Sequence, residues 1–190
     1  MTRGNVRSRI VDHAEDVFRR QGFSAASIQD LTDAADVPKG SFYNHFQTKA
    51  ELAAEIIDRY VNATDVTMLG QQGLPVIDRL RNHFAGQAWR TMATGLEFGC
   101  LLATLAAESP AGGDYLRKAV EQSLAKWTSA VTAAISEGQA AGEVTTRRPA
   151  ADLAAFLIDS FEGGALRTKV TGDATALVRH LEIALDALRP

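Results

Sequence analysis

Apolar residues recur every three or four positions along most of the chain, which is the spacing of one face of an α-helix. In the first such segment the apolar positions are Ile10, Val11, Ala14, Val17 and Phe18. Gly22 follows, and glycine readily takes the backbone conformation that ends a helix. The pattern predicts a first helix over residues 4–21. No later segment alternates with the two-residue period of a strand, so the predicted fold class is all-α.

The next three helices are predicted from their end signals. Ser27 precedes a second apolar stripe and has Asp30 three places on, so we expect it to cap a helix that stops at Asp36. The stretch "PKGSFYNHF", residues 38–46, leaves room for a short third helix, with Pro38 at its first position. Thr48 and Glu51 fit a capping box that opens a fourth helix, which is expected to run to about residue 67.

The clearest interruption of the helical pattern is the Gly- and Pro-containing segment 70–75. Further helices are expected over residues 76–92, within 100–108, over 115–139, from Pro149, and after Asp173, which would cap the last one. The total is about nine helices. We assign residues 1–48 to a first domain of three helices and residues 49–190 to a second, helical domain.

The composition limits the class of protein to which this chain can belong. The 190 residues are 46% hydrophobic and 23% charged, close to an average globular protein, and no apolar run is long enough to span a membrane. The first residues lack the apolar core of a secretory signal, so we expect a cytoplasmic protein with no membrane partner. The single cysteine and the four scattered histidines lack metal-ligand spacing, so neither a metal nor another cofactor is expected.

Charge has to be considered locally. The net charge of -3 argues against a broadly basic surface that coats nucleic acid. Residues 1–50 nevertheless hold seven Lys or Arg against six acids, and the basic residues lie at the N-terminus and in or beside "PKGSFYNHF". This distribution indicates a module with basic edges.

The second and third predicted helices are separated by three or four residues, which is the spacing of a helix-turn-helix motif. Asp36 tolerates the left-handed backbone that such a turn needs, and Val37 can fill the corner of the core. Phe42 and Phe46, four positions apart, are expected to anchor the third helix, which would then enter the major groove of DNA. A purely solvated polar surface is the alternative for the neighbouring residues.

Small residues in the third helix would permit close approach to DNA, and polar tips would reach phosphates or bases. Lys49 begins the next helix, where its charge and the free backbone N–H groups could meet one phosphate. The expected DNA-binding residues are Ser27, Lys39, Gly40, Ser41, Tyr43, Asn44, His45, Thr48 and Lys49.

These residues carry a resemblance to a known family. The apolar positions of the first two helices, the stretch "KGSFYNHF" and the following "KAEL" resemble the DNA-binding domain of the tetracycline-repressor (TetR) family of transcriptional regulators over about 45 residues. Asp36 stands where the family usually has Gly, and Pro38 where it often has Ser. The resemblance implies a homodimer that reads a pseudo-palindromic double-stranded operator, and a larger C-terminal domain that binds a small-molecule inducer.

Two later stretches, "EFGCLLATLAAE" at residues 97–108 and "SFEGGALRTKV" at 160–170, resemble a subset of this family that responds to electrophiles and acrylate-like compounds. Cys100 near a helix start could have an activated thiol and act as an electrophile sensor. The alternative is that Cys100 is a small buried apolar residue, the commonest fate of a lone cysteine.

A ligand pocket is expected among the helices of the second domain, and its mixed lining would suit a small, mostly apolar molecule with one or two polar groups. The candidate ligand-binding residues are His83, Trp89, Phe98, Cys100, Trp127, Phe156, Asp159 and Glu162. Gly163 and Gly164 give a small-residue patch on the next-to-last helix, so the last two helices are expected to form the homodimer interface.

The predicted function is a ligand-responsive DNA-binding regulator. A repressor is the usual case in the family, and an activator remains an open variant. Two further alternatives are a DNA-binding architectural protein without a ligand and a thiol sensor acting through Cys100. An enzyme is not expected, because no nucleophile with a base and no metal constellation stands out in the sequence.

Overall fold

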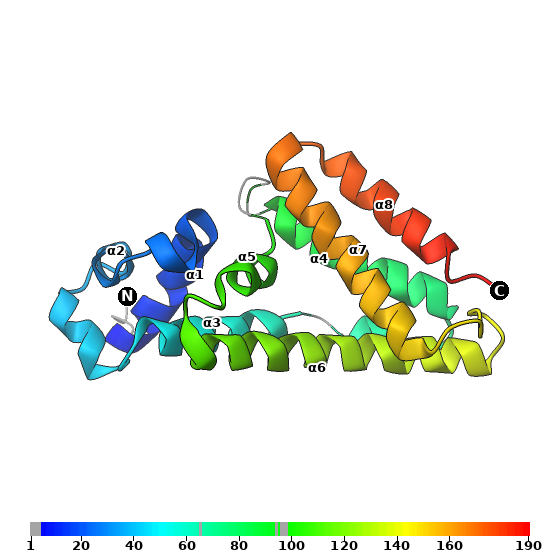
Figure 1. Cartoon of the computed structure of the whole chain (residues 1–190), viewed down its shortest axis with the longest axis horizontal. Helices are drawn as coiled ribbons and strands as arrows, with labels where there is room; N and C mark the ends of the chain where they lie inside the picture. Colours follow the sequence, from blue (N-terminus) through cyan, green and yellow to red (C-terminus); the bar gives the residue numbers. More distant parts are fainter. Residues whose placement is uncertain (1–4, 65, 94, 96–98) are drawn as a thin grey trace. The chain divides into compact units, whose positions relative to one another are not determined.

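The computed structural model describes residues 5–64, 66–93, 95 and 99–190. Within these ranges the regular structure consists of eight α-helices and two 3₁₀-helices, with no strand, which confirms the all-α prediction of about nine helices (Figure 1). The chain forms two compact units. The N-terminal unit combines Met1–Asn62 with Leu101–Ser123, and the C-terminal unit combines Ala63–Cys100 with Leu124–Pro190. This division differs from the expected one at residue 48, because two later segments pack with the first three helices.

The N-terminal unit contains α1 (Val6–Ala25), α2 (Ile28–Ala34), the 3₁₀-helix η1 (Lys39–Asn44), α3 (Lys49–Asn62), α5 (Leu101–Glu108) and the start of α6 (Gly113–Ala140). Its core consists of side chains that the helical spacing placed inward, all at most 1% exposed: Ile10, Ala14, Phe18, Leu31, Phe42, Phe46, Leu52 and Ile56. Gly22 interrupts α1 with a φ of 78°, as its position in the sequence predicted, and one further turn leads to Ala25.

Both ends of α2 follow from its local sequence. The Ser27 hydroxyl accepts the Asp30 N–H at 3.1 Å, and the Asp30 carboxylate accepts the Ser27 N–H at 2.8 Å. The hydrogen bonds from Ser27 hold the pKa of Asp30 below its ordinary value. At the other end Asp36 has a φ of 51°, and its N–H bonds the Asp33 carbonyl at 3.0 Å. The predicted cap and left-handed turn are both confirmed.

The left-handed residue Asp36 gives a prediction about stability. Such a backbone costs a non-glycine residue roughly 1 kcal/mol, whereas the exposed ion pair of Asp36 with Arg9 is worth less. We expect Asp36→Gly to raise the free energy of unfolding by about 0.5 kcal/mol and Asp36→Ala to lower it by about 1 kcal/mol. Urea unfolding of both variants checks this order, and a less stable glycine variant would contradict it.

The C-terminal unit contains the 3₁₀-helix η2 (Thr67–Gly70), α4 (Val76–Ala93), the rest of α6, α7 (Ala150–Thr171) and α8 (Ala174–Asp186). The helix predicted to reach residue 67 ends earlier, at Asn62, and η2 follows it. Pro149 and Asp173 precede α7 and α8 as expected, and the Asp173 carboxylate accepts the N–H of Thr175 at 3.0 Å.

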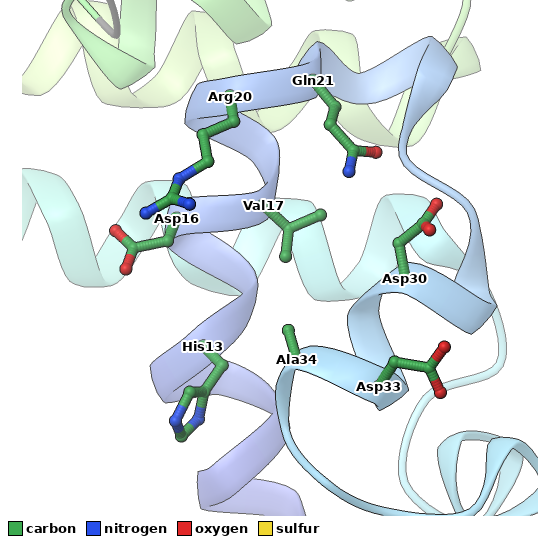
Figure 2. A pocket seen from close by; sticks show the side chains of 8 residues that line it. All are labelled: His13, Asp16, Val17, Arg20, Gln21, Asp30, Asp33 and Ala34. Carbon is green, nitrogen blue, oxygen red and sulfur yellow. The ribbon is translucent and has the colours of Figure 1, made fainter.

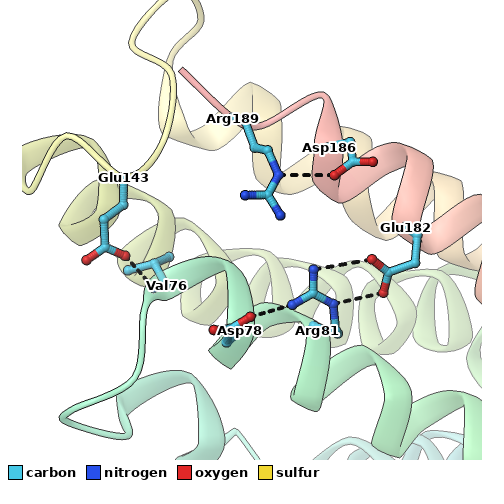
Figure 3. Close-up of polar contacts among 7 residues, drawn as sticks. All are labelled: Val76, Asp78, Arg81, Glu143, Glu182, Asp186 and Arg189. Carbon is cyan, nitrogen blue, oxygen red and sulfur yellow. Dashed lines mark hydrogen bonds and ion pairs between the residues drawn. The ribbon is translucent and has the colours of Figure 1, made fainter.

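Helices α7 and α8 run side by side in opposite directions (Figure 1). Their close approach depends on Gly164, because a Cβ there would lie 2.8 Å from the Leu177 side chain. Helix α4 is joined to α8 by Arg81, which donates to the Glu182 carboxylate at 2.9 and 3.2 Å and also pairs with Asp78 (Figure 3). These contacts join α7 and α4 to α8.

A second arginine, Arg79 of α4, links η2 and α6 to α4. Arg79, 2% exposed, donates to the Leu69 carbonyl in η2 at 3.0 Å and pairs with Glu137 in α6 at 2.8 Å. The hydrogen bond that Arg79 donates lowers the pKa of Glu137 below its ordinary value.

Within the ranges that the structure describes, no helix is both long and apolar enough to cross a membrane.

Candidate nucleic-acid interface and ligand region

The stretch between α2 and α3 is a 3₁₀-helix rather than an α-helix. Pro38 lies one position before η1 in extended backbone, with a ψ of 139°, so its expected place as first helical residue is wrong. Its carbonyl accepts the Ser41 N–H at 2.8 Å. The two aromatic anchors behave as predicted: Phe42 and Phe46 are 0% and 1% exposed, with ring centroids 5.5 Å apart. We call residues 38–49 the recognition segment.

The anchored rings leave the polar residues of the recognition segment on the outside. Lys39, Gly40, Tyr43 and Asn44 are exposed, Tyr43 to 58%, while Ser41 and His45 are half-buried. A Cβ at Gly40 would meet no atom within 4 Å, so this position is open to close approach by a partner. The segment therefore presents a phenol, an amide, an ammonium and an imidazole next to one another, the donor and acceptor types that read base edges and phosphates.

The three remaining candidates for DNA contact have internal partners. Ser27 and Thr48 act as helix caps, since the Thr48 hydroxyl accepts the Glu51 N–H at 3.1 Å. Lys49 points back into its own unit, where Nζ donates to the carbonyls of Phe23 and Ala26, at 2.6 Å each. Burial lowers the pKa of Lys49, against the opposing charge of Glu108. The phosphate contact expected of the Lys49 ammonium does not fit this geometry.

A shallow hollow of about 340 Å³ lies between α1 and α2 (Figure 2). Its lining includes the carboxylates of Asp16, Asp30 and Asp33 and only one guanidinium, that of Arg20. A surface with this charge repels phosphate. The hollow is therefore a poor candidate for contact with the DNA backbone.

In the C-terminal unit two predicted ligand residues meet inside an aromatic cluster. Trp127 Nε1 donates to His83 Nε2 at 2.9 Å, and His83 is 1% exposed. Phe84 and Phe161 pack against the Trp127 ring with centroid distances of 5.7 and 6.1 Å. Because an indole N–H can only donate, His83 Nε2 is the acceptor in this hydrogen bond.

Two other predicted ligand residues form a second polar pair. The Cys100 thiol, 4% exposed, donates to Glu162 Oε1 at 3.1 Å. The other oxygen, Oε2, is enclosed and has no hydrogen-bond partner among the described residues. Burial raises the pKa of Glu162 to about 7, against the lowering effect of the Cys100 hydrogen bond. The burial of Cys100 agrees with the simpler of the two alternatives for this residue.

This carboxyl predicts how stability depends on pH. Its pKa is about 7 in the folded protein and 4.5 in its ordinary state, so between these values the folded chain binds a proton that the unfolded chain does not. The free energy of unfolding should therefore fall as pH rises from 4.5 to 7, by at most about 1.4 kcal/mol per pH unit. Urea unfolding from pH 4.5 to 8 should show this loss in the wild type and not in Glu162→Gln. Glu121→Gln, at an exposed site, should behave like the wild type, and equal pH profiles in all three would refute the assignment.

The other predicted ligand residues do not join these two pairs. Trp89 is 67% exposed, Phe156 is 47% exposed, and Asp159 is exposed, so the three lie on the outer sides of α4 and α7. The apolar stripes of these helices turn Phe84 and Phe161 inward instead, which leaves other positions of the same helices on the outside. Phe98 lies outside the described residues.

Two residues of the site were not predicted from the sequence. Gln47 is exposed between η1 and α3, and its N–H donates to the Glu51 carboxylate at 2.7 Å. Because Gln47 is polar and lies between two predicted DNA-contact residues, the sequence could have indicated it as a further candidate. Glu108, at the end of α5, contacts the end of α1, and no local sequence pattern links segments so far apart in sequence.

Among the described residues, no group of three or more His, Cys, Asp or Glu is arranged to hold a metal ion.

Two family descriptions match the chain. "Bacterial regulatory proteins, tetR family" matches residues 10–56, which include α2 and the recognition segment. "Tetracyclin repressor-like, C-terminal domain" matches residues 76–184, which is more than half of the chain. The first match covers the helix-turn-helix, and the second covers α4 to most of α8.

Relatives and solved structures agree with these matches. The chain is 32% identical to the HTH-type transcriptional repressor DhaR of Mycobacterium sp. (strain GP1), over 100% of this chain and 96% of that protein. It is also 32% identical to the transcriptional regulator AcuR of Cereibacter sphaeroides, over 79% of this chain and 70% of that protein.

Among solved structures, the fold is similar to that of the regulatory protein TetR from Rhodobacter sphaeroides. The TM-score is 0.87 at 24% identity, over 96% of this chain and 98% of that one. The fold is also similar to that of reduced Escherichia coli NemR, with a TM-score of 0.82 at 22% identity, over 97% of each chain. At these identities the structural likeness concerns the fold, while the sequence matches decide the family. The chain belongs to the TetR family of DNA-binding, ligand-responsive transcriptional regulators.

Proposed function

We propose that this chain is a homodimeric repressor that binds a two-fold symmetric operator through its two recognition segments and is released by a small molecule bound in the C-terminal unit. The observation that carries the proposal is the recognition segment itself. Phe42 and Phe46 are buried in the core, and the polar residues between and before them face outward. The relatives named repressor or regulator support the same function.

On the DNA side, the proposed contacts are those of the exposed and half-buried residues of the recognition segment. Tyr43 and Asn44 can reach base edges, Lys39 can meet a phosphate, and Gly40 leaves room for the backbone to approach. Gln47 and Thr48 lie just before α3, whose positive end is a place at which a phosphate can bind. The proposed DNA-contact residues are Lys39, Gly40, Ser41, Tyr43, Asn44, His45, Gln47 and Thr48.

On the ligand side, the proposed site is the region of the His83–Trp127 and Cys100–Glu162 pairs. Aromatic rings there would hold an apolar molecule, and the enclosed Glu162 oxygen without a partner offers a polar contact. A sensor based on a Cys100 thiolate has less support, because such a thiolate would lie 3.1 Å from a carboxyl oxygen. We therefore propose reversible ligand binding rather than covalent modification.

For the dimer, the proposed surface is on α7 and α8. Half of the ten exposed large hydrophobic side chains in the described part of the chain lie on these two helices: Phe156, Leu166, Val170, Val178 and Ile183. Gly163 on the same face of α7 would place a Cβ in open space, so a partner helix can approach it closely. A dimer joined here carries two recognition segments, as a symmetric operator requires.

The proposed role is regulation of transcription by binding DNA. We therefore propose that the protein works in the cytoplasm and is not an enzyme.

Salt dependence of DNA binding tests the proposed contacts. Lys39→Ala should weaken operator binding and reduce the slope of log affinity against log salt by about 1 for each phosphate that is no longer neutralised, thus about 2 for the dimer. Tyr43→Ala should lower the affinity by roughly tenfold without changing the slope, since it removes no charge. Lys118→Ala, an exposed lysine of α6 in the same unit, is the matched control. An unchanged slope in Lys39→Ala would rule out a phosphate contact for Lys39.

A further inference from the structure

The connection from α1 to α2 is held by two charged side chains from elsewhere in the N-terminal unit. Lys49, at the start of α3, donates to the carbonyls of Phe23 and Ala26, at 2.6 Å each. Glu108, the last residue of α5, accepts the Ser24 N–H at 2.6 Å. The two side chains thus satisfy both the carbonyl oxygens and an N–H group that the end of α1 leaves without helical partners.

The backbone leaves room for the Glu108 carboxylate at one position. A Cβ on Gly22 would lie 2.0 Å from Glu108 Oε1 and 2.9 Å from its carboxyl carbon. Any side chain at residue 22 would therefore push the carboxylate away. Gly22 also has a φ of 78°, so glycine both turns the chain and makes space for the carboxylate.

These contacts lie at the two ends of the helix-turn-helix. Ser24 and Ala26 lie just before Ser27, the cap of α2, and Lys49 is the last residue of the recognition segment. The Glu108 carboxylate attracts the Lys49 ammonium. This attraction opposes the lowering of the Lys49 pKa by burial. Glu108 itself comes from α5, outside residues 10–56 that match the tetR-family description. Helix α5 follows Cys100 directly along the chain, so Glu108 is the far end of the helix that leads out of the C-terminal unit.

We propose that Glu108 is a positioning residue for DNA recognition: by holding the Ser24 N–H and facing Lys49, it fixes the start of α2 and the end of the recognition segment relative to each other. Operator affinity then depends on the place of α5, although α5 contains no residue proposed to contact DNA. This inference rests on the proposed function, because it takes the recognition segment as the DNA-contact surface.

The test uses the full-length protein with Glu108→Ala and Glu108→Gln. The alanine variant removes both the acceptor for Ser24 and the charge near Lys49, while the glutamine variant keeps an acceptor oxygen and the shape. The matched control is Glu121→Ala, an exposed carboxylate in the N-terminal unit. The two measurements are operator affinity and hydrogen exchange of the Ser24 amide, both made well below the unfolding temperature of every variant.

We expect Glu108→Ala to bind operator roughly tenfold more weakly and to exchange the Ser24 amide at least tenfold faster. Glu108→Gln should be intermediate in both, and Glu121→Ala should match the wild type. A purely structural role would lower the unfolding temperature and speed exchange without changing affinity. Fast Ser24 exchange with wild-type affinity would therefore overturn the inference and leave the proposed function intact. A wild-type protein without sequence-specific DNA binding would overturn both.

Discussion

Replacing both Leu166 and Val170 by Glu should convert the proposed dimer to a monomer and lower its operator affinity at least about 100-fold. The two side chains are 62% and 83% exposed on one face of α7, and Gly163 on that face leaves open space for a partner helix. Four like charges brought together in a two-fold interface would be strongly unfavourable. Loss of one recognition segment then removes half of the DNA contacts and the advantage of linking them.

Sedimentation or light scattering measures the mass of this variant, and fluorescence anisotropy with labelled DNA measures its affinity. Tyr115→Glu is a suitable control, because Tyr115 is 58% exposed on α6 in the N-terminal unit and also exchanges an exposed hydrophobic side chain for a carboxylate. Far-ultraviolet circular dichroism should remain that of a helical protein in both variants. A Leu166→Glu, Val170→Glu protein that stays dimeric would show that the interface lies elsewhere.

The second large effect is expected from Lys49→Met. Methionine keeps an apolar stem above the Phe23 ring, which lies 4.5 Å from Nζ, but it cannot donate to the carbonyls of Phe23 and Ala26. Two carbonyls left without partners should lower the free energy of unfolding by about 2 kcal/mol. For a chain of this size that corresponds to a decrease in melting temperature of roughly 4–8 °C.

The same variant decides between the two roles considered for Lys49. If its ammonium acts inside the N-terminal unit, the melting temperature falls and the salt dependence of DNA binding by the folded protein stays unchanged. If it contacts a phosphate, the melting temperature is preserved and the salt slope decreases. Lys118→Met removes an exposed lysine from the same unit and should change neither quantity.

Features set by neighbouring residues could be predicted from the sequence. Ser27 and Asp173 cap the helices that they precede, and Asp36 takes the left-handed turn. The two caps depend on side-chain to backbone contacts within a few positions, and the turn depends on a backbone conformation that Asp tolerates, so all three follow from residue type. Phe42 and Phe46 were predicted as anchors for a similar reason, because their spacing places both rings on one face of a short helix.

Features set by distant residues could not be predicted. The role of Lys49 depends on where the end of α1 lies, and that of Glu108 on the packing of α5 against α1, which residue spacing does not specify. The aromatic residues of the second domain show the same limit. Trp89 and Phe156 are aromatic, as expected of residues that line a pocket. Other residues form the buried faces of their helices, so both side chains face outward.

Operator release by a ligand requires that the ligand bind the DNA-free and DNA-bound forms with different affinity. The proposed ligand region and the recognition segment lie in different compact units, which share the continuous helix α6 and the direct link from Cys100 to α5. Glu108 of α5 accepts the N–H of Ser24, at the end of α1 and just before the helix-turn-helix. The coupling can therefore be measured as the change in operator affinity that a bound ligand produces in wild type and in Glu108→Gln.

A dimer of this chain is proposed to read a two-fold symmetric DNA sequence with its recognition segments. Repeated selection of bound duplexes from a random pool, followed by sequencing, tests it directly, because the random pool contains every candidate half-site. We expect one enriched motif with two inverted half-sites whose centres lie about one helical turn, or a multiple of it, apart. The same selection with Tyr43→Ala should give a weaker enrichment of this motif. A pool without an enriched motif, or an asymmetric single site, would contradict the account.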